Sequence, residues 1–330
     1  MKRALGAIAI VTIAAALIAG GVVIWGNNTF KKPGPLAEEA VLIIKRGAGL
    51  RTIAAQLENA GIIRYPLLFV AKAKWSDAHR DLKAGEYAFA AGASSASVLA
   101  KIRKGDVIIH QITIPEGLTS QQVVTLIRAT PALQGIIPDA PAEGSLLPET
   151  YDYIYGDMRV SLILRMKKAR EKVLAGLWKS RDKGLPLSGS RAALILASIV
   201  EKETGRSSER PRVAAVFINR MRLGMRLQSD PTVVYALTGG KGPLGRSLTR
   251  TDLSVDNPFN TYVIKGLPPG PIANPGTASL AAVLQPAKTN ELYFVANGTG
   301  GHAFAKTLRE HNRNVARWRK LQRKMRSQAK

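Results

Sequence analysis

The pattern of apolar and polar positions changes several times along the chain, and it begins with a long apolar run. After Lys2 and Arg3, residues 4–25 contain no charged side chain, and a helix needs about 20 apolar residues to cross a bilayer. The run exceeds the apolar core of an ordinary signal peptide, and it ends at Trp25 rather than at a small-residue cleavage site. We therefore predict a retained transmembrane helix over residues 4–25 rather than a cleaved signal.

Lys2 and Arg3 also predict the orientation of this helix. Positively charged flanks stay on the cytoplasmic side, so residues 1–3 are expected to form a cytoplasmic stub and the rest of the chain to lie across the membrane. Residues 26–39 follow with the Asn, Gly and Pro content of a linker.

Strand-like runs and helical spacings alternate between residues 40 and 106. Strands are indicated by short apolar runs, and helices by apolar residues that recur every three or four positions. The predicted elements are a strand (41–44), two helices (50–57 and 67–75), a strand (85–89) and a third helix (97–103). This order predicts a small α/β unit.

A larger region of mixed elements covers residues 107–312, and residues 313–330 form a basic C-terminal tail. The stretch 309–330 as a whole is basic and compatible with a helix. The predicted elements are a strand and turn (112–118), a helix (123–127), an ordered loop (138–156), a charged helix (162–181) and a strand (292–296) with a hairpin turn at Asn297-Gly298. The chain as a whole therefore predicts an α+β fold, with a transmembrane helix, a small α/β subdomain and a larger mixed domain.

The stretch from Ala192 to Tyr235 holds the candidate chemistry. Residues 192–200 are apolar on every side, as in a helix buried inside a domain, and two carboxylates follow at Glu201 and Glu203. On a helix these two side chains point to nearly opposite faces. The neighbours of Glu203 are the more apolar, which would raise its pKa and suit a general acid. Glu201 could instead be a structural acceptor, and both residues could simply be solvated at a helix end.

A second polar set lies downstream of this helix. Residues 228–232 are dense in hydrogen-bonding groups between two apolar runs, which suits a carbohydrate site. An ordinary turn, in which Asp230 caps the next helix, is the competing interpretation, because a residue before proline is usually extended or in a turn. A Pro-flanked loop adds further candidates. The candidate binding or supporting residues are Gln228, Ser229, Asp230, Thr232, Asn260 and Tyr262.

Composition narrows the function classes. The formal net charge is +25, which favours an anionic partner such as nucleic acid, a lipid surface or an acidic polymer. There is no cysteine, so disulfides and thiolate chemistry are excluded, and the four histidines show no metal-binding spacing. We expect no metal or other cofactor. A nucleic-acid binder is suggested by charge alone and lacks an aromatic-basic motif, so no nucleic-acid partner is expected.

Several long stretches, in order, resemble the endolytic murein transglycosylases of the YceG-like family. They are LASIVEKET (196–204), RVAAVFINR (212–220), MRLQSDPTV (225–233), NTY (260–262) and GLPPGPI (266–272). The resemblance implies a single-pass inner-membrane protein with a periplasmic catalytic domain, and a LysM-like subdomain at 41–104. It implies cleavage of murein between N-acetylmuramic acid (MurNAc) and N-acetylglucosamine (GlcNAc), leaving 1,6-anhydro ends, and release of nascent strands beside the murein synthases.

The resemblance also fits the residue chemistry, because a lytic transglycosylase can work with one carboxylate. The acid protonates the glycosidic oxygen, the muramyl C6 hydroxyl attacks intramolecularly, and the same carboxylate accepts the hydroxyl proton. Glu203-Thr204 resembles the Glu-Ser pair at the catalytic helix end of lysozyme-like transglycosylases, so Glu203 is preferred to Glu201 as the catalytic acid. The alternative is a non-catalytic glycan-binding scaffold for the synthases.

Overall fold

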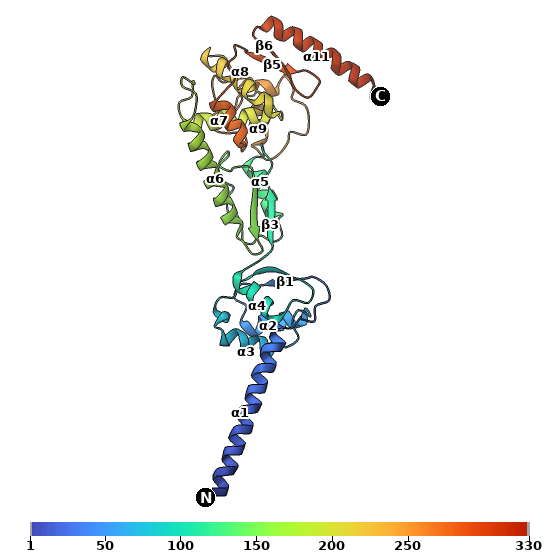
Figure 1. Cartoon of the computed structure of the whole chain (residues 1–330). Helices are drawn as coiled ribbons and strands as arrows, with labels where there is room; N and C mark the ends of the chain where they lie inside the picture. The colour runs from blue at the N-terminus through green and yellow to red at the C-terminus, as the bar shows by residue number, and fades with distance from the viewer. Residues whose placement is uncertain (1, 329–330) are drawn as a thin grey trace. The chain divides into compact units, whose positions relative to one another are not determined.

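The computed structural model describes residues 2–328 and divides into two units. Unit 1 comprises residues 1–110 and 152–157, and unit 2 comprises residues 111–151 and 158–330. Figure 1 traces the elements in chain order, from blue at the N-terminus to red at the C-terminus. Helices and short antiparallel strand pairs occur in the same chain, which confirms the predicted α+β class.

The first helix, α1, runs from Lys2 to Lys31. Its segment Ile8–Lys31 is 24 residues long and contains an 18-residue stretch of mean hydropathy 2.5 that is not buried in the protein, so the segment is long and apolar enough to span a membrane. The helix continues through residues 26–31, which the sequence analysis assigned to a linker. The reason is packing, since the Trp25 ring contacts Tyr65 edge-on at 5.7 Å and the Phe30 ring lies 6.4 Å from Phe69.

Unit 1 has the predicted order of strand, helix, helix and strand. Strand β1 (Ala40–Ile44) pairs antiparallel with β2 (Gly85–Phe89), with Leu42 opposite Tyr87. Helices α2 (Leu50–Asn59) and α3 (Pro66–Trp75) lie between the strands in sequence, and α4 (Ser95–Lys104) follows β2. The apolar faces of these elements form one core, which includes Ile53, Leu57, Phe69, Tyr87 and Ile102.

Strand β3 (Ile109–Thr113) pairs with β4 (Thr150–Ile154) in a second two-stranded sheet. The sequence analysis assigned the whole of 138–156 to an ordered loop and missed β4, because Pro and Gly surround a short run of strand-forming residues. Helix α5 (Ser120–Arg128) begins with a capping box between Thr119 and Gln122.

The core of unit 2 is helical. Helix α6 (Arg159–Lys179) leads into α7 (Ser190–Glu203), and α8 (Arg210–Arg222) and α10 (Thr277–Leu284) pack against α7. Residues 192–201 of α7 are all buried, which explains why this helix is apolar on every side. Between α8 and α10 the chain forms α9 (Asp230–Thr238) and long loops rich in Gly and Pro.

The C-terminal part of unit 2 is a hairpin followed by a long helix. Strands β5 (Tyr293–Ala296) and β6 (His302–Ala305) pair antiparallel, so the hairpin is confirmed, although its loop spans 297–301 rather than the predicted two residues. Helix α11 (Leu308–Gln328) contacts both strands. The sequence analysis predicted a helix-compatible stretch from residue 309, and α11 begins one residue earlier.

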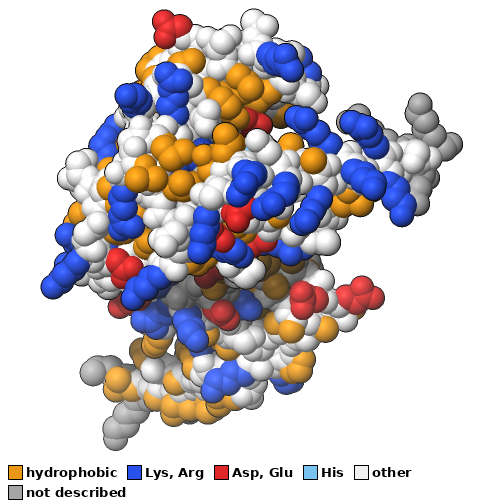
Figure 2. Space-filling view, turned by 90° about the horizontal axis from the view of Figure 1, so that it is seen from above, with side chains coloured by type: hydrophobic (Ala, Val, Ile, Leu, Met, Phe, Trp, Pro, Cys, Tyr) orange, Lys and Arg blue, Asp and Glu red, His pale blue; other side chains and the backbone are white. Residues whose placement is uncertain are grey.

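The positive charge is carried over the surface of the protein. In Figure 2, Lys and Arg side chains are distributed over much of the visible face, whereas Asp and Glu are few. This agrees with 48 Lys and Arg against 23 Asp and Glu in the sequence.

Candidate active site

Glu203 lies at the C-terminal end of helix α7, at the edge of the unit 2 core. The buried residues of α7 pack in the core with α8 and α10, and Glu203 is the last residue of the helix. Thr204 follows in an extended conformation, so the helix ends directly after the carboxylate. The carbonyl end of a helix carries partial negative charge, which disfavours an ionised carboxyl group at this position.

The hydroxyl of Ser229 donates a hydrogen bond to Glu203 Oε1. Ser229 is the N-cap residue of α9 and is 1% exposed, yet its hydroxyl makes no capping hydrogen bond to that helix. A serine at this position usually caps its own helix and contributes about 1 kcal/mol by doing so. The contact with Glu203 therefore replaces a local stabilising interaction.

The protonation of Glu203 is shifted in the direction that a general acid requires. Burial raises the pKa of Glu203 from 4.5 to about 7, and the negative charge of Asp230 adds to the rise. The Ser229 hydrogen bond and the Arg220 guanidinium oppose it. A carboxyl group of this kind is partly protonated at neutral pH and can both give and accept a proton there.

The Glu203 side chain lines a cavity of about 460 Å³, which is within the size range of small-ligand sites. Four of the residues predicted from the sequence line it, namely Glu203, Gln228, Asp230 and Tyr262. The remaining lining residues are Arg220, Leu227, Tyr293, Phe294, Val295, Leu308 and His311. The cavity thus combines one carboxyl group of raised pKa with polar and aromatic surfaces.

Asp230 and Tyr262 form a hydrogen-bonded pair in this cavity. The Tyr262 hydroxyl donates to Asp230 Oδ1 at 2.6 Å, and burial together with Asp230 raises the pKa of Tyr262 well above 10. The sequence analysis predicted an extended or turn conformation at Asp230, whereas the structure includes it as the first residue of α9. Pro231 is tolerated there because the backbone N–H groups in the first turn of a helix have no acceptor within the helix, so a proline without an N–H breaks no hydrogen bond.

Thr232 and Asn260 are fully buried, and they support the site through hydrogen bonds rather than by lining the cavity. Thr232 Oγ1 donates to the Ser229 carbonyl at 2.6 Å, and Thr261 Oγ1 accepts from Ser229 N at 3.0 Å. Asn260 Nδ2 donates to the carbonyls of Leu253 and Val255 at 3.1 and 2.8 Å. The Thr232 and Thr261 bonds fix the backbone that holds the Ser229 hydroxyl against Glu203, and the Asn260 bonds fix the loop that leads to Thr261.

Gln228 adopts a backbone conformation that is unusual for a residue with a side chain. Its φ is +51°, in the left-handed region that favours glycine. The conformation occurs between the buried Leu227 and the buried Ser229. Backbone strain of this kind often marks a functional site.

Glu201 lies outside the residues that line this cavity. Its side chain is buried, Oε1 accepts from Arg210 Nη2 at 3.0 Å, and Oε2 accepts from the backbone N of Gly276 at 2.9 Å. Gly276 is the N-cap of α10, so this carboxylate also lies at the favourable end of a helix dipole. Arg210 contacts Glu116 as well, at 2.7 Å. These contacts give Glu201 the geometry of a structural acceptor.

Another carboxyl group, that of the half-buried Glu143, also has a pKa raised by burial. Its Oε1 accepts from Ser120 N at 2.8 Å and from Asn274 Nδ2 at 3.3 Å. Glu143 does not belong to the lining of the Glu203 cavity, and its hydrogen bonds tie together backbone segments of unit 2.

The sequence analysis missed Arg220, Tyr293 and His311 as residues of this cavity. The Arg220 guanidinium donates to the carbonyls of Leu292 and Leu227 at 2.7 and 2.6 Å, and its Cζ lies 5.2 Å from the Tyr293 ring centre. The His311 ring stacks on the Tyr293 ring at 5.1 Å. Arg220 lies within a stretch that the sequence analysis quoted, so a basic residue flanked by apolar ones was an available signal. Nothing local in the sequence connects residues 293 and 311 to Glu203.

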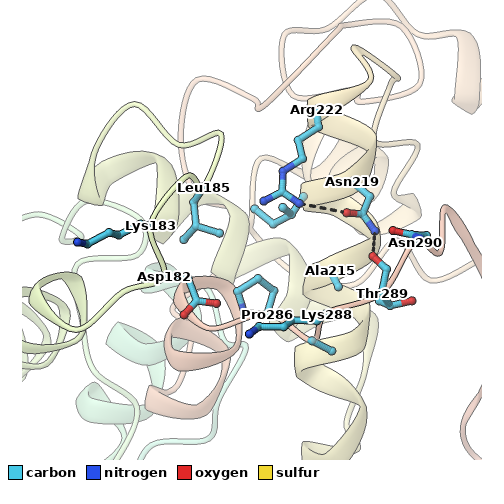
Figure 3. Close-up of a pocket in the computed structure, with 12 residues that line it drawn as sticks. Asp182, Lys183, Leu185, Ala215, Asn219, Arg222, Pro286, Lys288, Thr289 and Asn290 are labelled. Carbon is cyan, nitrogen blue, oxygen red and sulfur yellow. Dashed lines mark hydrogen bonds between the residues drawn. The ribbon is translucent and has the colours of Figure 1, made fainter.

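A larger cavity, of about 600 Å³, lies between the loop after α6, one face of α8 and residues 286–290 (Figure 3). Asn219 on α8 donates to the Thr289 carbonyl at 2.7 Å, and Arg222 Nη1 donates to the Asn219 side-chain oxygen at 3.4 Å. The carboxylate in its lining, Asp182, belongs to an exposed residue. Because this carboxylate is exposed to solvent, whereas Glu203 is half-buried, the smaller cavity is the candidate active site.

Comparisons with known proteins show the family of the chain. The profile of the YceG-like family matches residues 42–317. An endolytic murein transglycosylase of Bacillus subtilis (strain 168) is 31% identical over 329 residues and covers 90% of each chain. An endolytic murein transglycosylase of Streptococcus pneumoniae (serotype 2, strain D39) is 30% identical over 83% of this chain and 57% of its own.

A solved structure gives the same result. That of a yceG-like protein from Listeria monocytogenes is 32% identical, covers 84% of this chain and 98% of its own, and has a TM-score of 0.53. Because the family profile matches well over half of the residues, the chain belongs to the YceG-like family.

Proposed function

We propose that this chain is an endolytic murein transglycosylase, a lyase that cleaves glycan strands between MurNAc and GlcNAc and leaves 1,6-anhydro-MurNAc ends. The observation that carries the proposal is the Glu203 carboxyl group, whose pKa is raised to about 7 in a cavity that also presents Asp230 and Tyr262. The activity named for the bacillary and pneumococcal relatives supports the choice of substrate.

The reaction needs only one proton carrier. Protonated Glu203 gives its proton to the glycosidic oxygen as the bond to the anomeric carbon breaks. The C6 hydroxyl of the same muramyl residue then attacks that carbon, and the Glu203 carboxylate accepts the hydroxyl proton. The nucleophile belongs to the substrate, so its effective concentration is high and no second carboxylate is required. The Ser229 hydrogen bond holds the Glu203 carboxyl group in one orientation during both transfers.

We assign Gln228, Asp230 and Tyr262 to substrate binding, with Ser229, Thr232 and Asn260 as supporting residues. The first three line the cavity with side chains that can donate to and accept from sugar hydroxyl and acetamido groups. Ser229 donates to Glu203, Thr232 donates to the Ser229 carbonyl, and Asn260 fixes the loop that leads to Thr261, which accepts from Ser229 N. Glu201 belongs with the supporting group through its bonds to Arg210 and Gly276.

The proposal includes a location in the cell envelope. The helix α1 would anchor the protein in the inner membrane as a single span, with the basic N-terminal end in the cytoplasm and the catalytic region in the periplasm. Residues 41–104 would form a LysM-like subdomain, which the antiparallel pair β1–β2 and the two intervening helices support. The positive charge suits the carboxylates of murein peptides and anionic lipid. We assign the enzyme to the release of nascent strands beside the murein synthases.

The test is the chemistry of the product. Full-length protein in detergent is incubated with purified murein strands, and the fragments are analysed by mass spectrometry. The proposal predicts internal cuts and anhydro ends, each lighter by one water than a hydrolysis product. Reducing ends would make the protein a hydrolase, and binding without cleavage would make it a scaffold. Tight, saturable binding of duplex nucleic acid at physiological salt would support a different class of partner.

A further inference from the structure

His311 contributes an imidazole ring to the lining of the Glu203 cavity from a different element, α11. Its Nδ1 is fully enclosed and has no hydrogen-bond partner among the described residues. Its Nε2 also has no hydrogen bond within residues 2–328, but it is not among the enclosed atoms. Stacking on Tyr293 at 5.1 Å and 25° fixes the plane of the ring. The ring therefore offers one available nitrogen, Nε2, in a defined orientation.

The enclosed Nδ1 determines which nitrogen carries the proton. An enclosed N–H without an acceptor is rarer and more costly than an enclosed lone pair. The neutral ring with hydrogen on Nε2 avoids that cost, whereas an imidazolium ion would place an unpaired N–H on Nδ1. Burial and the nearby Arg220 cation lower the pKa of His311 and so favour the neutral ring. The other titratable groups lining this cavity are Glu203, Asp230, Tyr262 and Tyr293.

The surroundings of His311 indicate the kind of acceptor that fits. Leu227, Phe294, Val295 and Leu308 line the same cavity with apolar surface. A sugar hydroxyl has no methyl group to place against such a surface. An acetamido group has both a carbonyl oxygen that needs a donor and a methyl group that gains from apolar contact.

We propose that His311 is a substrate-positioning residue whose Nε2–H donates a hydrogen bond to the carbonyl oxygen of an acetamido group on the bound glycan. The proposal rests on the proposed function and adds to it a specificity for N-acetylated sugars. It predicts that the enzyme discriminates against murein from which the acetyl groups have been removed, and that much of this discrimination depends on one nitrogen of residue 311.

The test combines two substrates with three variants. The full-length protein and its His311→Leu, His311→Gln and His311→Asn variants are assayed on N-acetylated murein and on chemically de-N-acetylated murein. Re-acetylated murein is the control for damage to the strands. The amide nitrogen of Gln lies close to the position of Nε2, and that of Asn close to Nδ1, so the two amide variants separate the two nitrogens. Circular dichroism and melting curves check that each variant is folded.

We expect the wild type to prefer N-acetylated murein by at least about tenfold in kcat/KM, and His311→Leu to reduce that preference by about tenfold. His311→Gln should retain most of the preference and His311→Asn should not. A folded His311→Leu variant with lower activity but an unchanged preference would overturn the inference and leave only a packing role. Wild-type protein that cuts neither substrate would instead contradict the proposed function itself.

Discussion

The Ser229 hydroxyl donates its hydrogen bond to Glu203 rather than to the first turn of its own helix, α9. Two elements far apart in sequence, the end of α7 and the start of α9, are joined by this contact. It favours the ionised form of Glu203 and so opposes the effect of burial. Ser229 therefore tunes the same pKa that Asp230 and burial raise.

Replacing Ser229 by Ala should raise the pKa of Glu203 above about 7, because the removed hydrogen bond favours the carboxylate. The alkaline limb of the pH–activity profile, where the acid loses its proton, should move to higher pH by about half to one pH unit. We also expect about a tenfold loss of kcat, because the Glu203 carboxyl group would no longer be held in one orientation. Profiles of kcat/KM against pH provide the measurement, and an unmoved or acid-shifted limb would contradict this role of Ser229.

Replacing Asp230 by Asn should move the same limb in the opposite direction. The negative charge of Asp230 raises the pKa of Glu203, so its removal should lower that pKa by roughly half a unit or less. The Asn side-chain oxygen can still accept from Tyr262, which limits other changes. The pair Ser229→Ala and Asp230→Asn, measured in one buffer series, therefore gives shifts of opposite sign, and shifts of the same sign would refute the electrostatic account.

The stability of the fold should depend on Glu203 and on pH together. Because the folded pKa is raised from 4.5 to about 7, the protonated side chain contributes stability that is complete below pH 4.5 and is lost as the pH rises through 7. The glutamine side chain of Glu203→Gln does not ionise. The melting temperature of this variant should therefore match that of the wild type at pH 4.5 and exceed it by about a few degrees at pH 9. Melting curves at both pH values test this, and an equal difference at both would show an unshifted pKa.

Gln228 offers a test of whether the site stores backbone strain. Its φ of +51° should make Gln228→Gly neutral or stabilising, since glycine adopts this conformation without a steric cost of about 1 kcal/mol. Gln228→Ala, the matched control, keeps the strain while removing the same polar group. We expect both variants to bind glycan more weakly and only Gln228→Gly to keep or raise the unfolding free energy. Destabilisation by Gly as large as that by Ala would argue against strain at this residue.

Much of the architecture could be predicted because local patterns determine it. The buried helix α7 follows from the apolar run 192–200. The strand–helix–helix–strand order of unit 1 follows from short apolar runs that alternate with segments in which apolar residues recur every three or four positions. The separation of Glu201 from Glu203 follows from helix geometry, and the structure places them in different surroundings. The boundary error at residues 26–31 arose where packing against distant residues extends a helix.

The contacts that complete the candidate site could not be predicted because they join distant segments. Ser229 reaches Glu203 across 26 residues, and His311 stacks on Tyr293 across a hairpin. The left-handed backbone of Gln228 depends on the buried residues on both sides of it, which no local pattern records. A polar cluster such as residues 228–232 predicts hydrogen bonding but not the partner that each group selects.

The central claim is that Glu203, and not Glu201, carries the proton. The most direct test is mass spectrometry of murein digested by full-length wild type, Glu203→Gln and Glu201→Gln, with melting curves for each. Glu201→Gln should be less stable, because it leaves the buried Arg210 with one carboxylate fewer, but should still release anhydro-muropeptides. Glu203→Gln should fold and release none. Anhydro products from Glu203→Gln, together with their absence from a folded Glu201→Gln, would contradict the account.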